Sequence, residues 1–384
     1  MRQAPRFLWL FLAGAVLVAA ALTGCAPRVE PADLVLHDGK IATVDGARPS
    51  AQALAVRGDT IVALGTDEEI KPYIGERTQV IDLAGKLAIP GFIDSHLHFM
   101  GVGEQKLQLD LTKAKSWDGI VLMVAEAVKA TPPGQPIRGR GWHQEKWDKV
   151  PVPNVEGFPL HNALSKVSPN NPVYLTHASG HATIANAKAM ELAGITKKTP
   201  DPPGGNLVRD KQGNPIGVFR ERAAGLLRAP RTGATPQRTP EEAEAQSRKV
   251  IDLAVQECLS KGVTTVHDAG AGFQTVDLYK KLAGEKKLGV RLYVMVNGGN
   301  DSLRQNLAKY KMIGAEDKHL TVRAIKRVFD GALGSRSAWL LEPYADLATS
   351  TGVQTIPVAE LAETAKIAIE NGFQLNVHAI GDRD

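Results

Sequence analysis

Hydrophobic and polar positions in the second half of the chain follow two alternating periods. Short apolar runs rich in β-branched residues predict strands at residues 263–267, 291–296, 321–329 and 373–378. Stretches with helical spacing come before and between them and predict helices over residues 239–262, 273–288, 302–313 and 358–371. The first helix has a clear start, with Thr239 as N-cap, Pro240 next and acidic residues in the first turn. Strands that alternate with helices predict a parallel sheet of the α/β class.

Residues 31–89 follow a different pattern, typical of a small β unit. Apolar runs flank three turn pairs, which are Asp38-Gly39, Gly58-Asp59 and Ala84-Gly85. Such pairs favour tight hairpins, so we expect three hairpins, at residues 34–44, 53–64 and 79–89. The segment is therefore predicted to form a small, incomplete β-sandwich unit ahead of the larger domain.

An apolar strand at residues 89–93 leads into Asp94-Ser95-His96-Leu97-His98. Side chains alternate along a strand, so His96 and His98 are expected on one face, where two neutral imidazoles suit a divalent metal such as zinc. Asp94 falls on the same face and is a candidate for orienting a metal-binding residue without binding the metal itself. For an isolated pair of this kind, a surface histidine pair in a turn is an equal alternative.

The lengths of the segments indicate a (β/α)₈ barrel of the TIM type. Between His98 and Thr239 the pattern breaks into proline and glycine clusters and short apolar runs, which predicts a long insertion, about residues 105–249, after the first barrel strand. A complete barrel takes about 250 residues. What remains of residues 90–384 has room for roughly five units of such a barrel, so we expect the barrel to stop after about its fifth strand.

The N-terminus resembles an export signal. Arg2 and Arg6 precede an apolar stretch at residues 7–22, which is shorter than the roughly 20 residues of a membrane span. Leu22-Thr23-Gly24-Cys25 is similar to a bacterial lipobox, which implies a signal peptide over residues 1–24 and lipidation of Cys25. The mature protein is then expected outside the cytoplasm, anchored by lipid to the bacterial cell envelope on its periplasmic or cell-surface side. A plain signal peptide and a simple membrane anchor are the alternatives.

Net charge and cysteine content limit the possible binding partners and the possible disulfides. Losing Arg2 and Arg6 lowers the net charge from +5 to +3, and no basic run interleaved with aromatic residues occurs, which argues against a nucleic-acid partner. With Cys25 lipidated, Cys258 is left without a partner for an intrachain disulfide. Cys258 lies on the apolar stripe of a predicted helix, so it is expected to be a buried, inert thiol.

Two further residues stand near predicted strand ends. Lys326 shares a strand face with Ala324 and Val328, whose small side chains leave room for a long one, and His378 ends the strand at 373–378. Active-site groups of (β/α)₈ barrels sit at the carboxyl ends of the strands, so His96, His98, Lys326 and His378 are expected at one mouth. The alternative for Lys326 is a lysine whose amine reaches solvent there.

Seven stretches together resemble the metal-dependent amidohydrolase superfamily, in particular the amidohydrolase family 3 branch that includes N-substituted formamide deformylase-like enzymes. They are GFIDSHLHF at 91–99, the tryptophan pair in RGRGWHQEKW at 138–147, LTHASGHATIANAKAMELAGI at 175–195, GNPIGVFRE at 213–221, GVTTVHDAG at 262–270, IKRVFDGALGSRSA at 325–338 and NVHAIGDRD at 376–384. They cover the chain from about residue 32 to its end.

The resemblance implies a divalent metal, with zinc expected as one ion or two. It implies His96 and His98 as ligands from the first strand, Lys326 as a carboxylated bridge between two metals and His378 as a ligand from the fifth strand. An unmodified Lys326 beside a single metal is the alternative. Relatives add a histidine from strand six and, as general base, an aspartate from strand eight, and both are expected beyond residue 384.

Further candidates come from the insertion and from strand two. His177 and His181 are candidates for contact with substrate or for a structural role, and His267 is a third substrate candidate. Glu221 is a possible ligand, although a solvated carboxylate at a helix start is the preferred interpretation.

Two functional hypotheses follow from these residues. The first is a lipid-anchored, metal-dependent hydrolase of a non-peptide C–N bond in a small amide-type substrate, here as an N-terminal fragment. The second is a non-catalytic surface lipoprotein that retains the fold as a small-molecule binding module.

Overall fold

A computed structural model describes residues 29–227 and 239–384. The predicted signal peptide and Cys25 lie outside these residues. Within the described part, no helix is both long enough and apolar enough to cross a membrane. The chain divides into two units, Met1–Gly91 and Phe92–Asp384.

The N-terminal unit contains two small sheets. One has the order β5-β4-β1-β6 and the other β3-β2-β7. The strands are β1 (Leu34–His37), β2 (Lys40–Ala42), β3 (Ser50–Ala51), β4 (Ala53–Arg57), β5 (Thr60–Gly65), β6 (Gln79–Asp82) and β7 (Leu87–Ala88). A short helix, α2 (Asp67–Ile70), follows β5 and is closed by a capping box between Thr66 and Glu69.

Only one of the three predicted hairpins forms. β4 and β5 pair antiparallel, as expected. The other two predictions are wrong, because β1 and β2 belong to different sheets, as do β6 and β7. Instead β1 pairs in parallel with β6, and β2 with β7. The chain therefore crosses from one sheet to the other at Asp38-Gly39 and again at Ala84-Gly85. The two strands that flank each of these turns are not hydrogen-bonded to each other.

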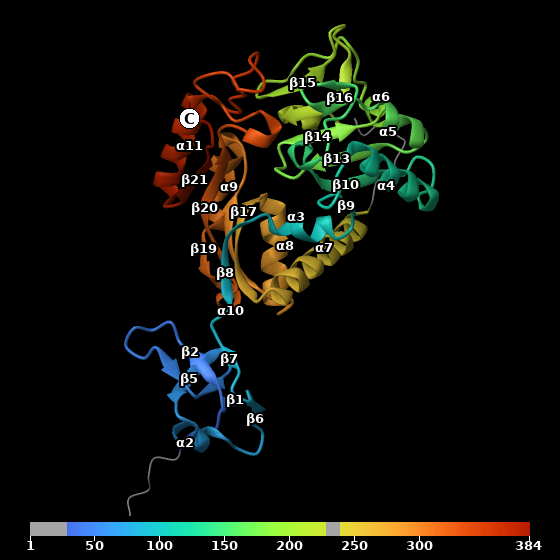
Figure 1. Cartoon of the computed structure of the whole chain (residues 1–384). Coiled ribbons are helices and arrows are strands. Elements are labelled where there is room, and N and C mark those ends of the chain that lie inside the picture. The colour runs from blue at the N-terminus through green and yellow to red at the C-terminus, as the bar shows by residue number, and fades with distance from the viewer. Residues whose placement is uncertain (1–28, 228–238) are drawn as a thin grey trace, which may run out of the picture. The chain divides into compact units, whose positions relative to one another are not determined.

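The larger unit is built on a parallel sheet, coloured from cyan to red in Figure 1. Its five parallel strands run in the order β8-β17-β18-β20-β21, a half-barrel arrangement. They are β8 (Phe92–Leu97), β17 (Val263–Ala271), β18 (Arg291–Val296), β20 (Leu320–Val328) and β21 (Gln374–His378). Short β19 (Met312–Gly314) adds to β20 antiparallel. The α/β class and the predicted strands are confirmed.

The connecting helices also match the sequence pattern. They are α7 (Pro240–Ser260), α8 (Phe273–Gly284), α9 (Asn300–Tyr310) and α11 (Val358–Asn371), with α3 (Phe99–Gln105) after β8 and a distorted turn, α10 (Ala315–Lys318), before β20. α7 begins as predicted, since the Thr239 hydroxyl accepts from the Glu242 amide and the Glu242 carboxylate accepts from the Thr239 amide.

The two faces of the parallel sheet carry different side chains. Residues such as Val266, Val294 and Val322 pack with the helices into the largest apolar cluster, which includes the thiol of Cys258. Cys258 is therefore buried, as expected. A separate small cluster holds Ala269, Met295 and Ala324, with Tyr293 packed against it.

The insertion forms a second sheet with its own core, drawn in green in Figure 1. Its six strands run in the order β15-β16-β14-β13-β10-β9. They are β9 (Leu109–Asp110), β10 (Ile137–Trp142), β13 (Val173–His177), β14 (Ala182–Ala185), β15 (Gly205–Arg209) and β16 (Pro215–Glu221). Helices α4 (Trp117–Ala130), α5 (Asn162–Val167) and α6 (Ala187–Leu192) accompany it, with the short pair β11 (Asn154–Val155) and β12 (Phe158–Pro159). Residues 240–249, counted with the insertion in the prediction, instead begin α7.

The loop that follows β20 ties the insertion to the parallel sheet. The Gln144 amide donates to the Gly334 carbonyl at 2.5 Å, and the Ser337 hydroxyl donates to the Glu221 carboxylate at 2.6 Å. Arg336 adds an ion pair with Glu145 at 3.2 Å. Polar contacts therefore hold this loop against the insertion at the carboxyl end of β20.

Candidate functional site

The four predicted metal ligands line one cavity of about 490 Å³. His96 lies near the end of β8 and His98 follows it, with ring centroids 5.8 Å apart. Lys326 comes from β20 and His378 from β21. The half-barrel thus brings residues from three separate strands to one place, at the carboxyl ends of the strands.

Both early imidazoles are held in a neutral state by their surroundings. Burial, Lys326 and His378 lower the pKa of His96, although Asp94 opposes the shift. Burial, His96 and Lys326 lower the pKa of His98. A neutral imidazole is the form that binds a metal, so this electrostatic setting suits ligands.

Asp268 fixes the backbone that carries His98. One of its carboxylate oxygens accepts from the Phe99 amide at 3.2 Å and the other from the Tyr279 hydroxyl at 2.9 Å. Burial raises the pKa of Asp268. The start of α3 is thereby anchored to β17, immediately after the second histidine.

Lys326 is buried, with 5% of its surface exposed. Burial lowers the pKa of its amine. Among the described residues the amine has no hydrogen bond or ion pair, so a buried cation stands here without a partner. The alternative of a lysine reaching solvent at the mouth does not agree with this burial.

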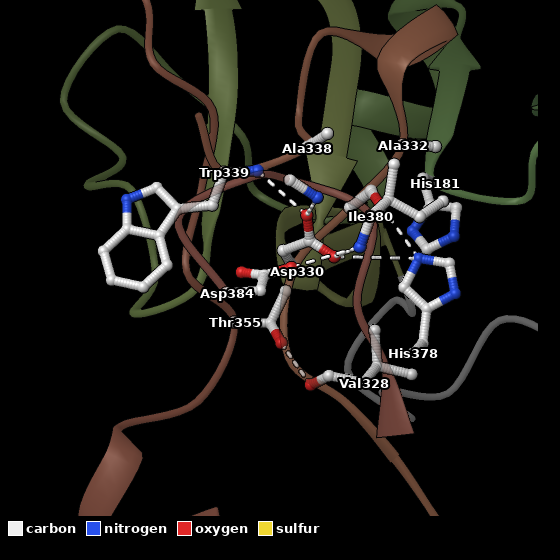
Figure 2. A network of polar contacts seen from close by, with 12 residues as sticks. His181, Val328, Asp330, Ala332, Ala338, Trp339, Thr355, His378, Ile380 and Asp384 are labelled. Atoms are coloured by element: carbon white, nitrogen blue, oxygen red, sulfur yellow. Dashed lines mark hydrogen bonds and ion pairs between the residues drawn. The ribbon is translucent and has the colours of Figure 1, made fainter. Parts of the chain in front are cut away.

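His378 is braced by the segment that follows β20. Its Nε2 lies 2.9 Å from the carbonyl of Gly331 and 3.9 Å from a carboxylate oxygen of Asp330. A carbonyl only accepts, so Nε2 carries the proton and Nδ1 is the nitrogen left with a free lone pair. Figure 2 shows Asp330 beside His378, bound to the backbone of Trp339 and Ile380.

These donors fit a divalent metal by their chemistry. Among the described residues no three His, Cys, Asp or Glu side chains stand together as a ready cluster. The fit rests instead on two imidazoles of lowered pKa, an unpartnered buried amine at Lys326 and the free Nδ1 of His378. Nitrogen donors of this kind suit zinc and related transition metals.

Asp94 is placed differently from its prediction. Its carboxylate accepts from the backbone amide of His96 at 3.0 Å. It lines a neighbouring cavity with Leu97 and Cys258, and no described hydrogen bond joins it to an imidazole. The pairing of β8 with β17 shifts register here, which interrupts the regular alternation of side chains that the prediction assumed.

Glu221 is the clearest correction to the sequence interpretation. It ends β16 directly before a short 3₁₀ helix, Arg222–Leu227, so the helix-start position is as predicted, but only 6% of its side chain is exposed and the carboxylate is not solvated. Its backbone lies in the left-handed region, with φ at 49°. Its carboxylate accepts from the Ser337 hydroxyl at 2.6 Å and stands 2.9 Å from Nδ1 of His181. This buried carboxylate therefore orients a histidine of the cavity wall.

The three substrate candidates separate in the structure. His181 lines the cavity, and its ring lies 4.8 Å from that of His378 (Figure 2). His267 is not among the lining residues; its ring lies tilted against that of Tyr293, with the centroids 4.8 Å apart. His177 is wholly buried against Trp142, and its Nδ1 accepts from the Ser179 amide.

His177 gives a prediction for acid stability. Burial lowers its pKa to about 3, so the unfolded chain binds the proton more readily than the folded one between that value and about 6.5. The free energy of unfolding should fall as the pH drops through this window. In His177→Asn, whose amide oxygen can replace Nδ1, the loss between about pH 7 and pH 4.5 should be smaller by roughly 2–3 kcal/mol. Urea unfolding at both pH values measures it, and equal losses in both proteins would contradict it.

Sequence reasoning missed two groups at this site. Asp330 lies two residues beyond the end of the fourth parallel strand, and its polar character at that position was an available signal. Arg140 lines the cavity from β10, far from the other lining residues in sequence. Its place depends on how the insertion packs, for which the sequence carried no sign.

Comparison with known proteins agrees with the fold and the site. A family model described as "Amidohydrolase family" matches residues 79–384. The chain is 30% identical to putative amidohydrolase YtcJ of Bacillus subtilis, over 91% of this chain and 63% of that protein. It is 27% identical to N-substituted formamide deformylase of Arthrobacter pascens, over 91% and 64% respectively. It is 31% identical to Protein LONG AFTER FAR-RED 3 of Arabidopsis thaliana, over 92% and 59%.

A solved structure supports the same conclusion. An uncharacterised metal-dependent hydrolase from Pyrococcus furiosus superposes with a TM-score of 0.62 at 25% identity, covering 91% of this chain and 68% of that one. The chain spans 59–64% of the length of the three relatives above. The family match covers most of the chain and includes every strand of the half-barrel. The chain belongs to the amidohydrolase family.

Proposed function

We propose that the protein is a metal-dependent hydrolase that cleaves a non-peptide carbon–nitrogen bond in a small amide-type substrate. One observation carries the proposal: His96, His98, Lys326 and His378, from three strands, line a single cavity in a chain of the amidohydrolase family. The deformylase relative acts on N-substituted formamides by its name, which supports an amide-type bond here.

His96, His98 and His378 would hold the metal, with Lys326 as the bridge or as a neighbouring group. When bound, a divalent metal, for which we propose zinc, supplies the Lewis acidity that activates water and polarises a carbonyl. If its amine is unmodified, Lys326 adds positive charge to the cavity, which favours the negative charge that develops on a carbonyl oxygen under attack. Hydrolysis consumes one water and yields an amine and a carboxylic acid. No described residue is assigned as the general base.

We also propose that the protein is exported and anchored to the cell envelope through Cys25. The proposal is supported by the signal-like residues 1–24 and the lipobox-like run that ends at Cys25. It agrees with a small-molecule substrate, because an envelope enzyme meets such molecules before they enter the cell.

Metal binding tests the central proposal. The full protein, stripped of metal, is titrated with Zn²⁺ by calorimetry. Replacing both His96 and His98 with alanine should weaken binding at least about tenfold, because both donors are removed. His267→Ala is the matched control, since this histidine lies outside the cavity, and it should leave the affinity unchanged.

Turnover supplies the second half of the test. The metal-loaded protein is incubated with formamides, N-acyl amino acids and cyclic imides, and amine release is measured. Metal-dependent release supports the hydrolase. Zinc binding equal in the double variant and the wild type, with no release from any amide, would overturn it and favour the binding module.

A further inference from the structure

Arg140 stands in the wall of the site cavity without a partner. It lies on β10 of the insertion and is half-buried. Among residues 29–227 and 239–384 its guanidinium makes no hydrogen bond and no ion pair. Burial lowers its pKa, and the negative charge of Glu104 opposes that shift. Arginine is seldom buried without an anion, because its charge loses hydration there.

The guanidinium is held in a defined place. A Cβ atom built on Gly180 would stand 3.4 Å from one of its terminal nitrogens, so the group lies directly against this glycine. Gly180 has φ of +82°, a conformation that glycine adopts readily. On the other side, Arg140 contributes to the lowered pKa of His98. It therefore shares the cavity wall with Gly180 and with the candidate ligands.

The rest of the lining makes the cavity strongly receptive to anions. It contains two cations, Arg140 and Lys326, together with four histidines, and no aspartate or glutamate is among the lining residues that the structure describes. Neutral donors, Gln105, Ser179 and Asn297, complete the polar part. A site walled by one sign of charge selects ligands of the opposite sign.

We propose that Arg140 binds a carboxylate of the substrate. The substrate class is then an amide that carries a carboxylate a short distance from the bond to be cleaved, as in N-acyl amino acids. A guanidinium offers two parallel N–H donors that match the two oxygens of one carboxylate, and one positive charge matches one negative charge. This assignment rests on the proposed hydrolase function and narrows its substrate.

A second arginine on the same strand provides the contrast. Arg138 is exposed and lies over the Tyr174 ring, 4.9 Å from its centroid, outside the cavity lining. Both arginines contribute the same charge to β10. An effect of Arg140 that Arg138 does not share must therefore come from its position in the cavity.

The experiment compares acids with their neutral isosteres. N-acetylglycine, N-acetyl-β-alanine and N-acetyl-γ-aminobutyrate are each paired with the corresponding primary amide. Binding to the full metal-loaded protein is measured by calorimetry, and amine release is followed separately. Wild-type protein, Arg140→Met and Arg138→Met are compared at low and at high salt.

For at least one pair, the wild type should bind the acid about tenfold more tightly than the amide. Arg140→Met should lose this preference, and Arg138→Met should keep it. A preference retained in Arg140→Met, or equal binding of all acids and amides by the wild type, overturns the assignment. Because binding is read without turnover, a protein that prefers acids through Arg140 but releases no amine would contradict the hydrolase proposal and leave the carboxylate site standing.

Discussion

Replacing Asp330 with alanine is expected to lower the free energy of unfolding by roughly 3–5 kcal/mol. Its side chain is fully buried and accepts three backbone amides, from Trp339 at 2.9 Å, Gly381 at 2.7 Å and Ile380 at 3.1 Å. Alanine would leave the Trp339 and Gly381 amides without this acceptor, while the Ile380 amide keeps the Asp384 carboxylate at 3.1 Å. It would also remove the carboxylate beside His378 (Figure 2). Urea unfolding followed by circular dichroism measures the change.

Asp382 offers the matched control. Its carboxylate accepts one amide, from Leu341 at 2.8 Å, and is exposed. Asp382→Ala should cost less than about 1 kcal/mol, because water can replace that hydrogen bond. Equal losses in the free energy of unfolding for the two variants would contradict the prediction that the buried Asp330 network contributes more to stability than an exposed hydrogen bond.

Lys326→Met should separate stability from function. The amine of Lys326 is buried without a described partner, which is unfavourable for folding, and methionine fills a similar volume without the charge. We expect the free energy of unfolding to stay equal or rise by about 1 kcal/mol. If the proposed function holds, hydrolysis of the best amide substrate should fall at least about 100-fold, because the proposal places this lysine in the metal site.

The control for this variant is on the same strand. Arg323 of β20 is exposed, so Arg323→Met removes a cation from the same element without touching the cavity. Arg323→Met should change neither the free energy of unfolding nor the rate of hydrolysis. If Lys326→Met instead destabilised the protein and kept full activity, the lysine would be a structural residue.

The parts of the fold that the sequence predicted are those set by local pattern. The helix start at Thr239 was readable because a capping box needs only four consecutive residues. Strand β18 was readable because its apolar run is bounded on both sides. The histidine pair was readable because spacing along one strand fixes which side chains can share a face.

The parts that failed depend on contacts distant in sequence. Whether β1 pairs with β2 or with β6 is decided by packing of the whole N-terminal unit, and the turn at Asp38-Gly39 serves either arrangement. Glu221 meets Ser337 across 116 positions, and Gln144 meets Gly334 across 190. Neither short-range periodicity nor composition predicts such long-range contacts, so the wall of the cavity was the least predictable part of the site.

The candidate ligands stand on one sheet, whereas Arg140 and His181 reach the cavity from another sheet with a separate core. Under the proposed function and substrate class, reactivity and selectivity reside in two scaffolds, the sheet that carries the candidate ligands and the sheet that carries Arg140, each with its own core. Natural variation in the second scaffold can retune which molecules are accepted while the chemistry stays intact. Laboratory libraries aimed at new specificities should accordingly diversify the second scaffold and leave the first unchanged.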